Sequence, residues 1–226
     1  MNDKVNGGVA KWAAVTQGIT TFVNDTTSKG LGIGIQYFGL PPSVACPVAC
    51  AIDADCGTSG PCDSAATHVC LGCFAGDSCT ASDYATPDVG IGTLPTVGSS
   101  IVASLANHAP STADALAPAL DGAITYTKSY AQAHWGHAVA VVLVTDGPPS
   151  ECTTDLSSIA ALAAAGLPVV HTFIVGLGSS TSVLDGVAQA GGTGAVMTVD
   201  TNQPLPLRIQ QALTQIASSA ALACAP

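Results

Sequence analysis

The stretch VVLVTDGPPSEC, residues 141–152, is the part of the sequence that indicates the fold most directly. Its first four residues are aliphatic, which is typical of a parallel strand whose two faces are both covered. Asp146 follows where this strand leaves the sheet, and a glycine and two prolines end the strand behind it. Because open α/β sheets bind ligands beyond the carboxyl ends of their strands, Asp146 is a candidate site residue.

The sequence from this stretch onward alternates between extended and helical patterns. It predicts, in order, a strand at 138–145, a helix at 155–165, a strand at 168–175, a short helix at 182–190, a strand at 195–199 and a helix at 206–222. Strands that alternate with helices predict an α/β fold, in which a doubly wound, mostly parallel sheet of the Rossmann-like type carries helices on both faces.

The sequence before this stretch is less regular. Apolar spacing predicts helices at 5–24, 98–107 and 116–134, and alternation predicts a strand at 31–40 that ends at two prolines. Between the cysteine-rich segment and Pro95 the chain is rich in Gly, Pro, Ser and Thr, which predicts a loop.

Nine cysteines are spread unevenly along the 226 residues. Seven of them fall within 34 residues: Cys46, Cys50, Cys56, Cys62, Cys70, Cys73 and Cys79. So dense a cluster, with little apolar sequence between its members, predicts a disulfide-stapled insertion at 41–83 inside an α/β domain formed by 1–40 and 84–226. The spacing of Cys70 and Cys73 also fits a zinc knuckle, although a second matched pair is lacking. The odd number leaves at least one thiol unpaired or paired outside this chain.

The charge balance limits the kinds of partner. Acidic residues outnumber Lys and Arg by 15 to 5, so few cations are present to neutralise a nucleic acid. A net charge of −10 is compatible with binding divalent cations. No apolar stretch has the length of a membrane span. The cysteines predict an extracytoplasmic protein, secreted, periplasmic or at the cell surface, although MNDKVNGG lacks the apolar core of a signal peptide.

Recognisable catalytic motifs are missing from the sequence. It contains no G-x-S-x-G nucleophile elbow, no H-E-x-x-H pair and no P-loop. We therefore expect a binding protein rather than an enzyme. A hydrolase that uses Asp146 as a metal ligand or nucleophile is the less favoured alternative, because no partner base is recognisable.

Four motifs together resemble those of a von Willebrand factor type A domain. They are VVLVTDGPPSEC (141–152), the helix entry APALDGA (117–123), HTFIVGLG (171–178) and AGGTGAVMTVDT (190–201). The resemblance covers residues 1–40 and about 84–226, and the cysteine-rich insertion is similar to those of bacterial surface or secreted versions. It implies the doubly wound fold and a role in adhesion or protein binding.

Domains of this family usually hold Mg²⁺ or another divalent cation in a metal-ion-dependent adhesion site, to which an acidic residue of the ligand binds. That site uses a DxSxS loop, a threonine from a second loop and an aspartate after a later strand. Asp146 matches the aspartate, whereas the threonine position falls on Asp114, with Thr112 two residues earlier. The DxSxS loop is absent, so we expect a degenerate or truncated site that binds the ion weakly. A structural surface module without a metal site is the alternative.

The resemblance also implies that the first strand, which is central in the family's sheet, is missing. The chain begins MNDKVNGGVAKW, as though Met1 were the last residue of the DxSxS loop. Two neighbouring strands would then have unpaired backbone groups. We expect that the sequence starts at an internal methionine or is a fragment, and the alternative is a rearranged sheet that closes the gap. Cys152 and Cys224 form a candidate disulfide between the loop after Asp146 and the end of the last helix.

Overall fold

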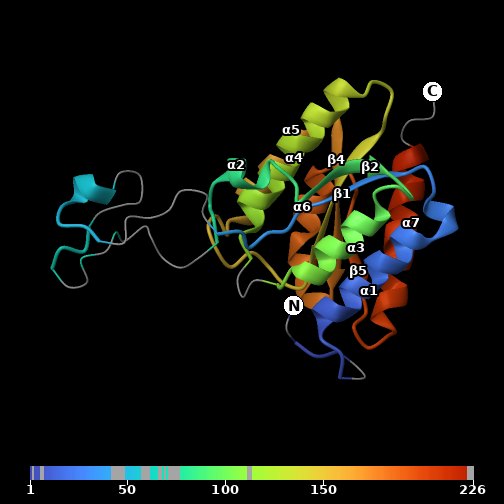
Figure 1. Cartoon of the computed structure of the whole chain (residues 1–226), viewed down its shortest axis with the longest axis horizontal. Helices are drawn as coiled ribbons and strands as arrows, with labels where there is room; N and C mark the ends of the chain where they lie inside the picture. The colour runs from blue at the N-terminus through green and yellow to red at the C-terminus, as the bar shows by residue number, and fades with distance from the viewer. Residues whose placement is uncertain are drawn as a thin grey trace.

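The fold is seen in a computed structural model, which describes residues 1, 3–5, 8–41, 49–56, 62–65, 68, 70, 77–110 and 114–222 (Figure 1). The helices are α1 (Lys11–Asn24), α2 (Ala81–Tyr84), α3 (Gly98–Asn107), α4 (Leu116–Ala133), α5 (Leu156–Gly166), α6 (Asp185–Ala190) and α7 (Leu205–Leu222). The strands are β1 (Gly32–Ile35), β2 (Val89–Thr93), β3 (Val139–Thr145), β4 (Val170–Leu177) and β5 (Met197–Val199). Short 3₁₀ helices are η1 (Thr26–Ser28), η2 (Asp53–Cys56) and η3 (Ser179–Leu184).

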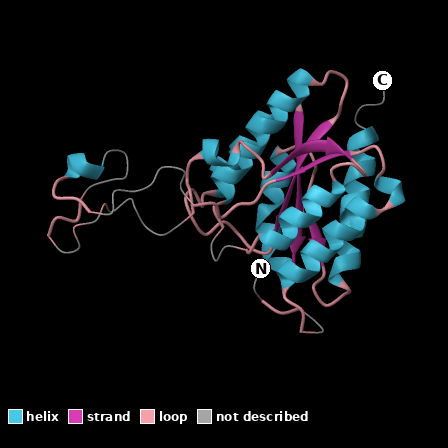
Figure 2. Ribbon diagram, viewed as in Figure 1, coloured by secondary structure: helices cyan, strands magenta, loops and turns pink. Residues whose placement is uncertain are grey.

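A parallel sheet with the strand order β3-β4-β5 forms the centre of the α/β body. Its register places Val139 beside Val170 and Thr145 beside Gly176. Alternate residues of β3 pack on opposite faces, with Val139, Val141 and Leu143 toward α4, α5 and α6, and Val142 and Val144 toward α1 and α7. Helices therefore enclose the strands on both sides (Figure 2). This arrangement confirms a mixed α/β fold with a parallel sheet flanked by helices.

Strands β1 and β2 form a separate antiparallel pair. Gly32 pairs with Thr93, and Ile33 pairs with Gly92. The sequence predicts a loop where β2 lies, and that prediction is wrong. The strand is hard to recognise in the five-residue sequence VGIGT, because its two glycines interrupt the alternation of apolar and polar side chains and glycine is rare in strands. The single sheet expected from the sequence is therefore divided into two sheets.

Strands β1 and β3 each have a single strand neighbour in the part of the chain that the structure describes. Five of the seven residues of β3 are partly exposed, whereas six of the eight residues of β4, which lies between β3 and β5, are buried. Helix α1 nevertheless packs against β1 and against the parallel sheet. Helix α4 contacts the antiparallel pair, because the Tyr126 hydroxyl accepts a hydrogen bond from the Ile91 amide of β2. A rearranged sheet that joins β1 to β3 is thus not seen among the described strands.

Helix α1 begins later than the helix predicted at 5–24, because described residues before it pair with one another instead of continuing the helix. Lys4 and Ala10 form an antiparallel bridge, and the Val5 amide donates a hydrogen bond to the Val9 carbonyl (2.9 Å). Gly8 has a φ of 76°, in the left-handed region that favours glycine. No described helix combines the length and the apolar character needed to cross a membrane.

The cysteine-rich insertion contains the internal disulfides Cys50–Cys62 and Cys56–Cys70, which confirms that it is disulfide-rich. Figure 1 draws η2 of this insertion well apart from the helices of the α/β body. Cys46, Cys73 and Cys224 lie outside the described residues. The zinc-knuckle spacing of Cys70 and Cys73 therefore stays a prediction.

Candidate functional site

The turn after β3 is fixed by local hydrogen bonds. The buried Thr145 hydroxyl donates to the Gly147 carbonyl (3.0 Å) and accepts from the Gly147 amide (3.3 Å). The Ser180 hydroxyl, from η3, donates to the Asp146 carbonyl (3.3 Å). The main chain of Asp146 is thus held at the carboxyl end of the parallel sheet, between the ends of β3 and β4.

Two ammonium groups of the chain bind the carboxylate of Asp146. The α-ammonium of Met1 donates to Oδ2 at 2.6 Å, and Nζ of Lys11 donates to the same oxygen at 3.1 Å. The side chain of Asp146 is only 11% exposed. Because partly buried charges are screened less than exposed ones, these two contacts dominate the electrostatics of the Asp146 carboxylate.

Asp114 lies beside the same turn. Its amide donates to the Ser150 hydroxyl (2.9 Å), and its carbonyl accepts from the amides of Ser150 (3.2 Å) and Glu151 (3.4 Å). A Cβ atom placed on Gly147 would lie 3.7 Å from Oδ2 of Asp114. The structure therefore brings Asp114 and the Asp146 turn together at one end of the sheet. Thr112 falls outside the described residues, and its role as a ligand stays a prediction.

The two carboxylates have opposite shifts in pKa. Burial raises the pKa of Asp146, but hydrogen bonds and charges from the Met1 ammonium and Lys11 outweigh burial and leave the pKa lowered. Burial raises the pKa of Asp114, and the negative charge of Asp146 raises it further. Asp146 is therefore kept ionised, whereas Asp114 occupies a place that disfavours its charge.

The donor set fits a hard divalent cation in its chemistry, because carboxylate oxygens are the ligands that Mg²⁺ and Ca²⁺ prefer. Asp146 and Asp114 are the described residues that would hold the ion. The charge state fits less well, since Oδ2 of Asp146 already accepts from Met1 and Lys11. Sequence reasoning missed both cations, although Lys11 is one of only five basic residues and follows the amino terminus closely.

Replacing Asp114 with Asn is expected to stabilise the protein at neutral pH. The raised pKa of Asp114 means that its ionised form penalises folding above that pKa and that the penalty disappears as the pH falls. The variant should melt about 1–3 °C higher at pH 7, the scale of a partly exposed charge contact. Its advantage should shrink as the pH falls toward the ordinary aspartate range. Thermal melts of both proteins between pH 7 and pH 4 measure this difference, and an advantage that does not vary with pH would contradict the assignment.

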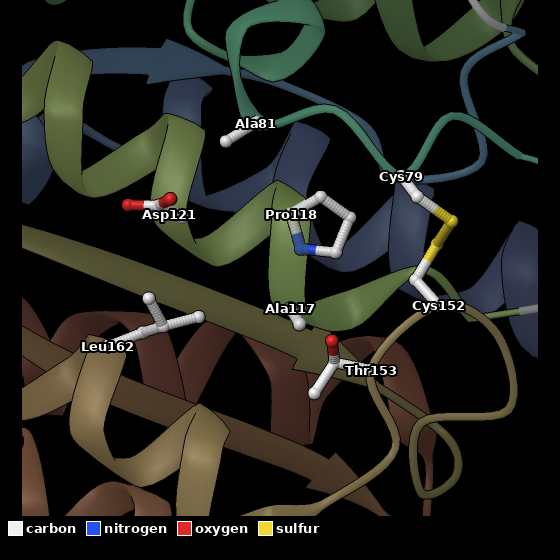
Figure 3. Close-up of a pocket in the computed structure, with 8 residues that line it drawn as sticks. All are labelled: Cys79, Ala81, Ala117, Pro118, Asp121, Cys152, Thr153 and Leu162. Atoms are coloured by element: carbon white, nitrogen blue, oxygen red, sulfur yellow. A yellow bond between two sulfur atoms is a disulfide. The ribbon is translucent and has the colours of Figure 1, made fainter. Parts of the chain in front are cut away.

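A disulfide between Cys79 and Cys152 ties the end of the insertion to the loop after Asp146 (Figure 3). The suggested pairing of Cys152 with Cys224 is therefore wrong. The seven clustered cysteines are also not a self-contained unit, because Cys79 bonds outside their segment.

Hydrogen bonds reinforce this connection at the base of the insertion. The Asp77 amide donates to the Glu151 carboxylate (3.0 Å), and the Ser78 amide donates to the Leu40 carbonyl (2.6 Å). The buried Tyr84 hydroxyl donates to the Ser78 carbonyl (2.7 Å), and burial raises the pKa of Tyr84 to about 12. The two ends of the insertion thus meet at the loop that also hydrogen-bonds to Asp114.

A surface pocket of about 300 Å³ lies beside the Cys79–Cys152 disulfide (Figure 3). It is lined by Cys79, Ala81, Ala117, Pro118, Asp121, Cys152, Thr153 and Leu162. Neither Asp146 nor Asp114 lines it, so this pocket and the two carboxylates at the sheet end are separate features. The lining is mostly small or apolar, with Asp121 as its charged group.

No protein-family model matches this sequence, and no curated protein matches it significantly. The resemblance to a type A domain rests on the four motifs and on the α/β architecture, and the function it implies is therefore a proposal.

Proposed function

We propose that the chain is an extracytoplasmic binding module of the von Willebrand factor type A kind, in which Asp146 and Asp114 hold a divalent cation weakly. The observation that carries this proposal is the convergence of two partly buried acidic residues at the carboxyl end of a parallel sheet. A bound Mg²⁺ would supply an open coordination position for an acidic group on a protein or surface ligand.

The chain's own charges set the strength of such a site. Met1 and Lys11 bring positive charge to the oxygen that a cation needs, so they oppose its binding. Asp114 favours cation binding. Burial and the charge of Asp146 disfavour its ionised form, and a nearby cation would stabilise that form. We therefore propose an affinity on the order of 1 mM, at the weak end of protein sites for divalent cations.

The proposal places the protein in an oxidising compartment, because three disulfides connect described residues and such crosslinks persist outside the cytoplasm. It also makes the protein a binding module rather than an enzyme. The described groups that contact the Asp146 carboxylate are ammonium groups, which neutralise a carboxylate rather than activate it as a nucleophile or base.

The test is the melting temperature with and without divalent cation. At 10 mM Mg²⁺ or Mn²⁺, an affinity near 1 mM should stabilise the protein by about 1.4 kcal/mol and raise the melting temperature by about 3–6 °C. Asp146→Asn should abolish this rise, because it removes the charge of the principal ligand. Asp121→Asn, which changes an acidic residue on α4, is the matched control and should keep the rise.

A second candidate function is a structural surface module in which the ammonium groups permanently close the site. The short contact of Met1 with Asp146 favours it. An unchanged melting temperature in the wild-type protein at all cation concentrations would support this alternative, as would an equal rise in the Asp146→Asn variant.

A further inference from the structure

Four of the five described cysteines of the insertion lie close together. Cys50, Cys56, Cys62 and Cys70 form a buried cluster of their own, with exposed fractions of 6%, 2%, 9% and 1%. The sulfur atoms of Cys50, Cys56 and Cys70 all lie within 4.8 Å of one another, and Cys62 is bonded to Cys50. Two disulfides alone do not require sulfur atoms of different bonds to lie so close together, because each bond needs only its own pair of sulfur atoms to meet.

The sulfur atoms of Cys50, Cys56 and Cys70 lie close enough together to surround one metal ion. Zinc bound by four thiolates has Zn–S distances of about 2.3 Å, which places the sulfur atoms about 3.8 Å apart. After reduction, the two sulfur atoms of each disulfide would move apart and those of different disulfides would move together to reach this tetrahedron. Zn²⁺ binds soft thiolate ligands well, whereas the hard divalent cation proposed to bind Asp146 prefers oxygen ligands.

The loops that carry these cysteines have local hydrogen bonds that do not depend on sulfur. The Asp55 carboxylate accepts from the amides of Ala51 (2.8 Å) and Ile52 (3.1 Å). The Asp53 carboxylate accepts from the Cys62 amide (2.8 Å). These bonds restrict the backbone before Cys56 and at Cys62, so they favour the same arrangement of cysteines after the disulfides are opened.

The cluster has no substitute for its sulfur crosslinks. The apolar side chains buried together here are the cysteines themselves, among the described residues of the insertion. A reduced insertion therefore needs a metal ion to stay folded, as small domains without a core commonly do.

We propose that the reduced insertion binds one Zn²⁺ through Cys50, Cys56, Cys62 and Cys70. Reduction of both disulfides takes up four electrons and four protons, supplied by two equivalents of a dithiol, each of which is oxidised to its own disulfide. Coordination then releases the four thiol protons as the sulfur atoms become thiolates bound to zinc. The insertion thus has two alternative crosslinks, disulfides under oxidising conditions and zinc under reducing conditions.

Cobalt titration of the full chain tests this proposal. The protein is reduced with a dithiol under anaerobic conditions, the reductant is removed, and Co²⁺ is added. We expect one equivalent of Co²⁺ to give the sulfur-to-cobalt charge-transfer absorption and the visible bands of a tetrahedral thiolate site, and Zn²⁺ to remove both. Limited proteolysis should show that Zn²⁺ protects the reduced insertion from cleavage.

Substitutions distinguish metal binding by this cluster from metal binding by the other cysteines. Cys56→Ser should weaken Co²⁺ binding by about 100-fold or more, since it removes one of four ligands. The double variant Cys79→Ser/Cys152→Ser removes two cysteines outside the cluster and should bind as wild type does. A triple variant with serine at 46, 73 and 224 should also bind normally.

Two results would overturn the proposal. One is a reduced wild-type chain that shows no tetrahedral thiolate spectrum. The other is a spectrum that survives Cys56→Ser but is lost in the triple variant, which would assign the metal to the other cysteines. Circular dichroism of each variant checks that the α/β body is folded, so a lost spectrum cannot be assigned to global unfolding.

Discussion

Acetylation of the amino terminus together with Lys11→Gln is expected to strengthen divalent-cation binding at least tenfold, a gain of about 1.4 kcal/mol. The Met1 ammonium and the Lys11 ammonium lie 2.6 Å and 3.1 Å from the same oxygen of Asp146. They neutralise the negative charge that would attract a metal cation, and they also repel that cation directly. Removing both charges leaves the Asp146 carboxylate without these two partners, beside Asp114, whose negative charge is already disfavoured.

The same change should destabilise the protein when no divalent cation is added. A partly buried carboxylate that loses its partners is costly, and losses of about 3 kcal/mol occur for fully buried pairs, so a smaller loss is expected here. Cation addition should then restore stability. Melting curves across a Mn²⁺ titration measure both effects in one experiment.

Lys29→Gln is the matched control for this experiment, because Lys29 is exposed and lies at the end of η1. It should leave both the cation affinity and the basal stability unchanged. Addition of Asp146→Asn to the acetylated Lys11→Gln protein should eliminate binding. Equal cation affinity before and after removal of the two ammonium groups would mean that the ion does not bind at Asp146.

Replacing Cys79 and Cys152 with Ser is expected to lower the free energy of unfolding by about 2–4 kcal/mol, or by about 5–15 °C in melting temperature. The disulfide joins residues that are 73 positions apart, so its loss releases a long segment in the unfolded chain. Cys152 has a φ of 61°, a conformation that non-glycine residues seldom adopt, and the disulfide helps to hold it there. Urea titration of the oxidised proteins measures the loss.

The loop after Asp146 should also become more dynamic in this variant. Hydrogen exchange should speed up at Ser150 and Glu151, whose amides donate to the Asp114 carbonyl. Cys50→Ser/Cys62→Ser is the matched control, because it removes a disulfide within the insertion and should leave exchange in this loop unchanged. An equal effect of both double variants on the loop would show that Cys79–Cys152 has no special coupling to it.

The elements of the parallel sheet are predictable from the sequence because each carries a local signal. Val141 to Val144 form a continuous apolar run, and the Asp155 side chain accepts from the Ser158 amide (2.8 Å) as a helix N-cap, with a pKa lowered to about 2. Strand β2 gives no such signal, since its glycines suit a loop equally well. The division into two sheets depends on pairing between distant segments, which residue periodicity does not encode.

The candidate site was only partly predictable for a similar reason. Asp146 is found from its position at the end of a strand, and Asp114 only from the resemblance to a type A domain. The electrostatics of Asp146 depend on Met1 and Lys11, which are 145 and 135 residues away in the chain. The Cys79–Cys152 bond likewise joins residues whose spacing gives no indication of their pairing. Sequence spacing identifies candidate ligands and cysteines, whereas the fold decides which groups neutralise or crosslink them.

The edge of β3 opposite β4 has no strand neighbour among the described residues, which favours pairing with a strand of another molecule. Residues Val139 to Val144 have no charge and no proline, and they combine high β propensity with an edge that no described strand covers, the features of segments that nucleate fibrils. Helices α1 and α4 pack on opposite sides of this strand and keep its two faces from neighbouring molecules. Transient detachment of either helix therefore exposes an intermolecular docking strand, and fibril formation should begin from that partly opened state rather than from the fully unfolded chain.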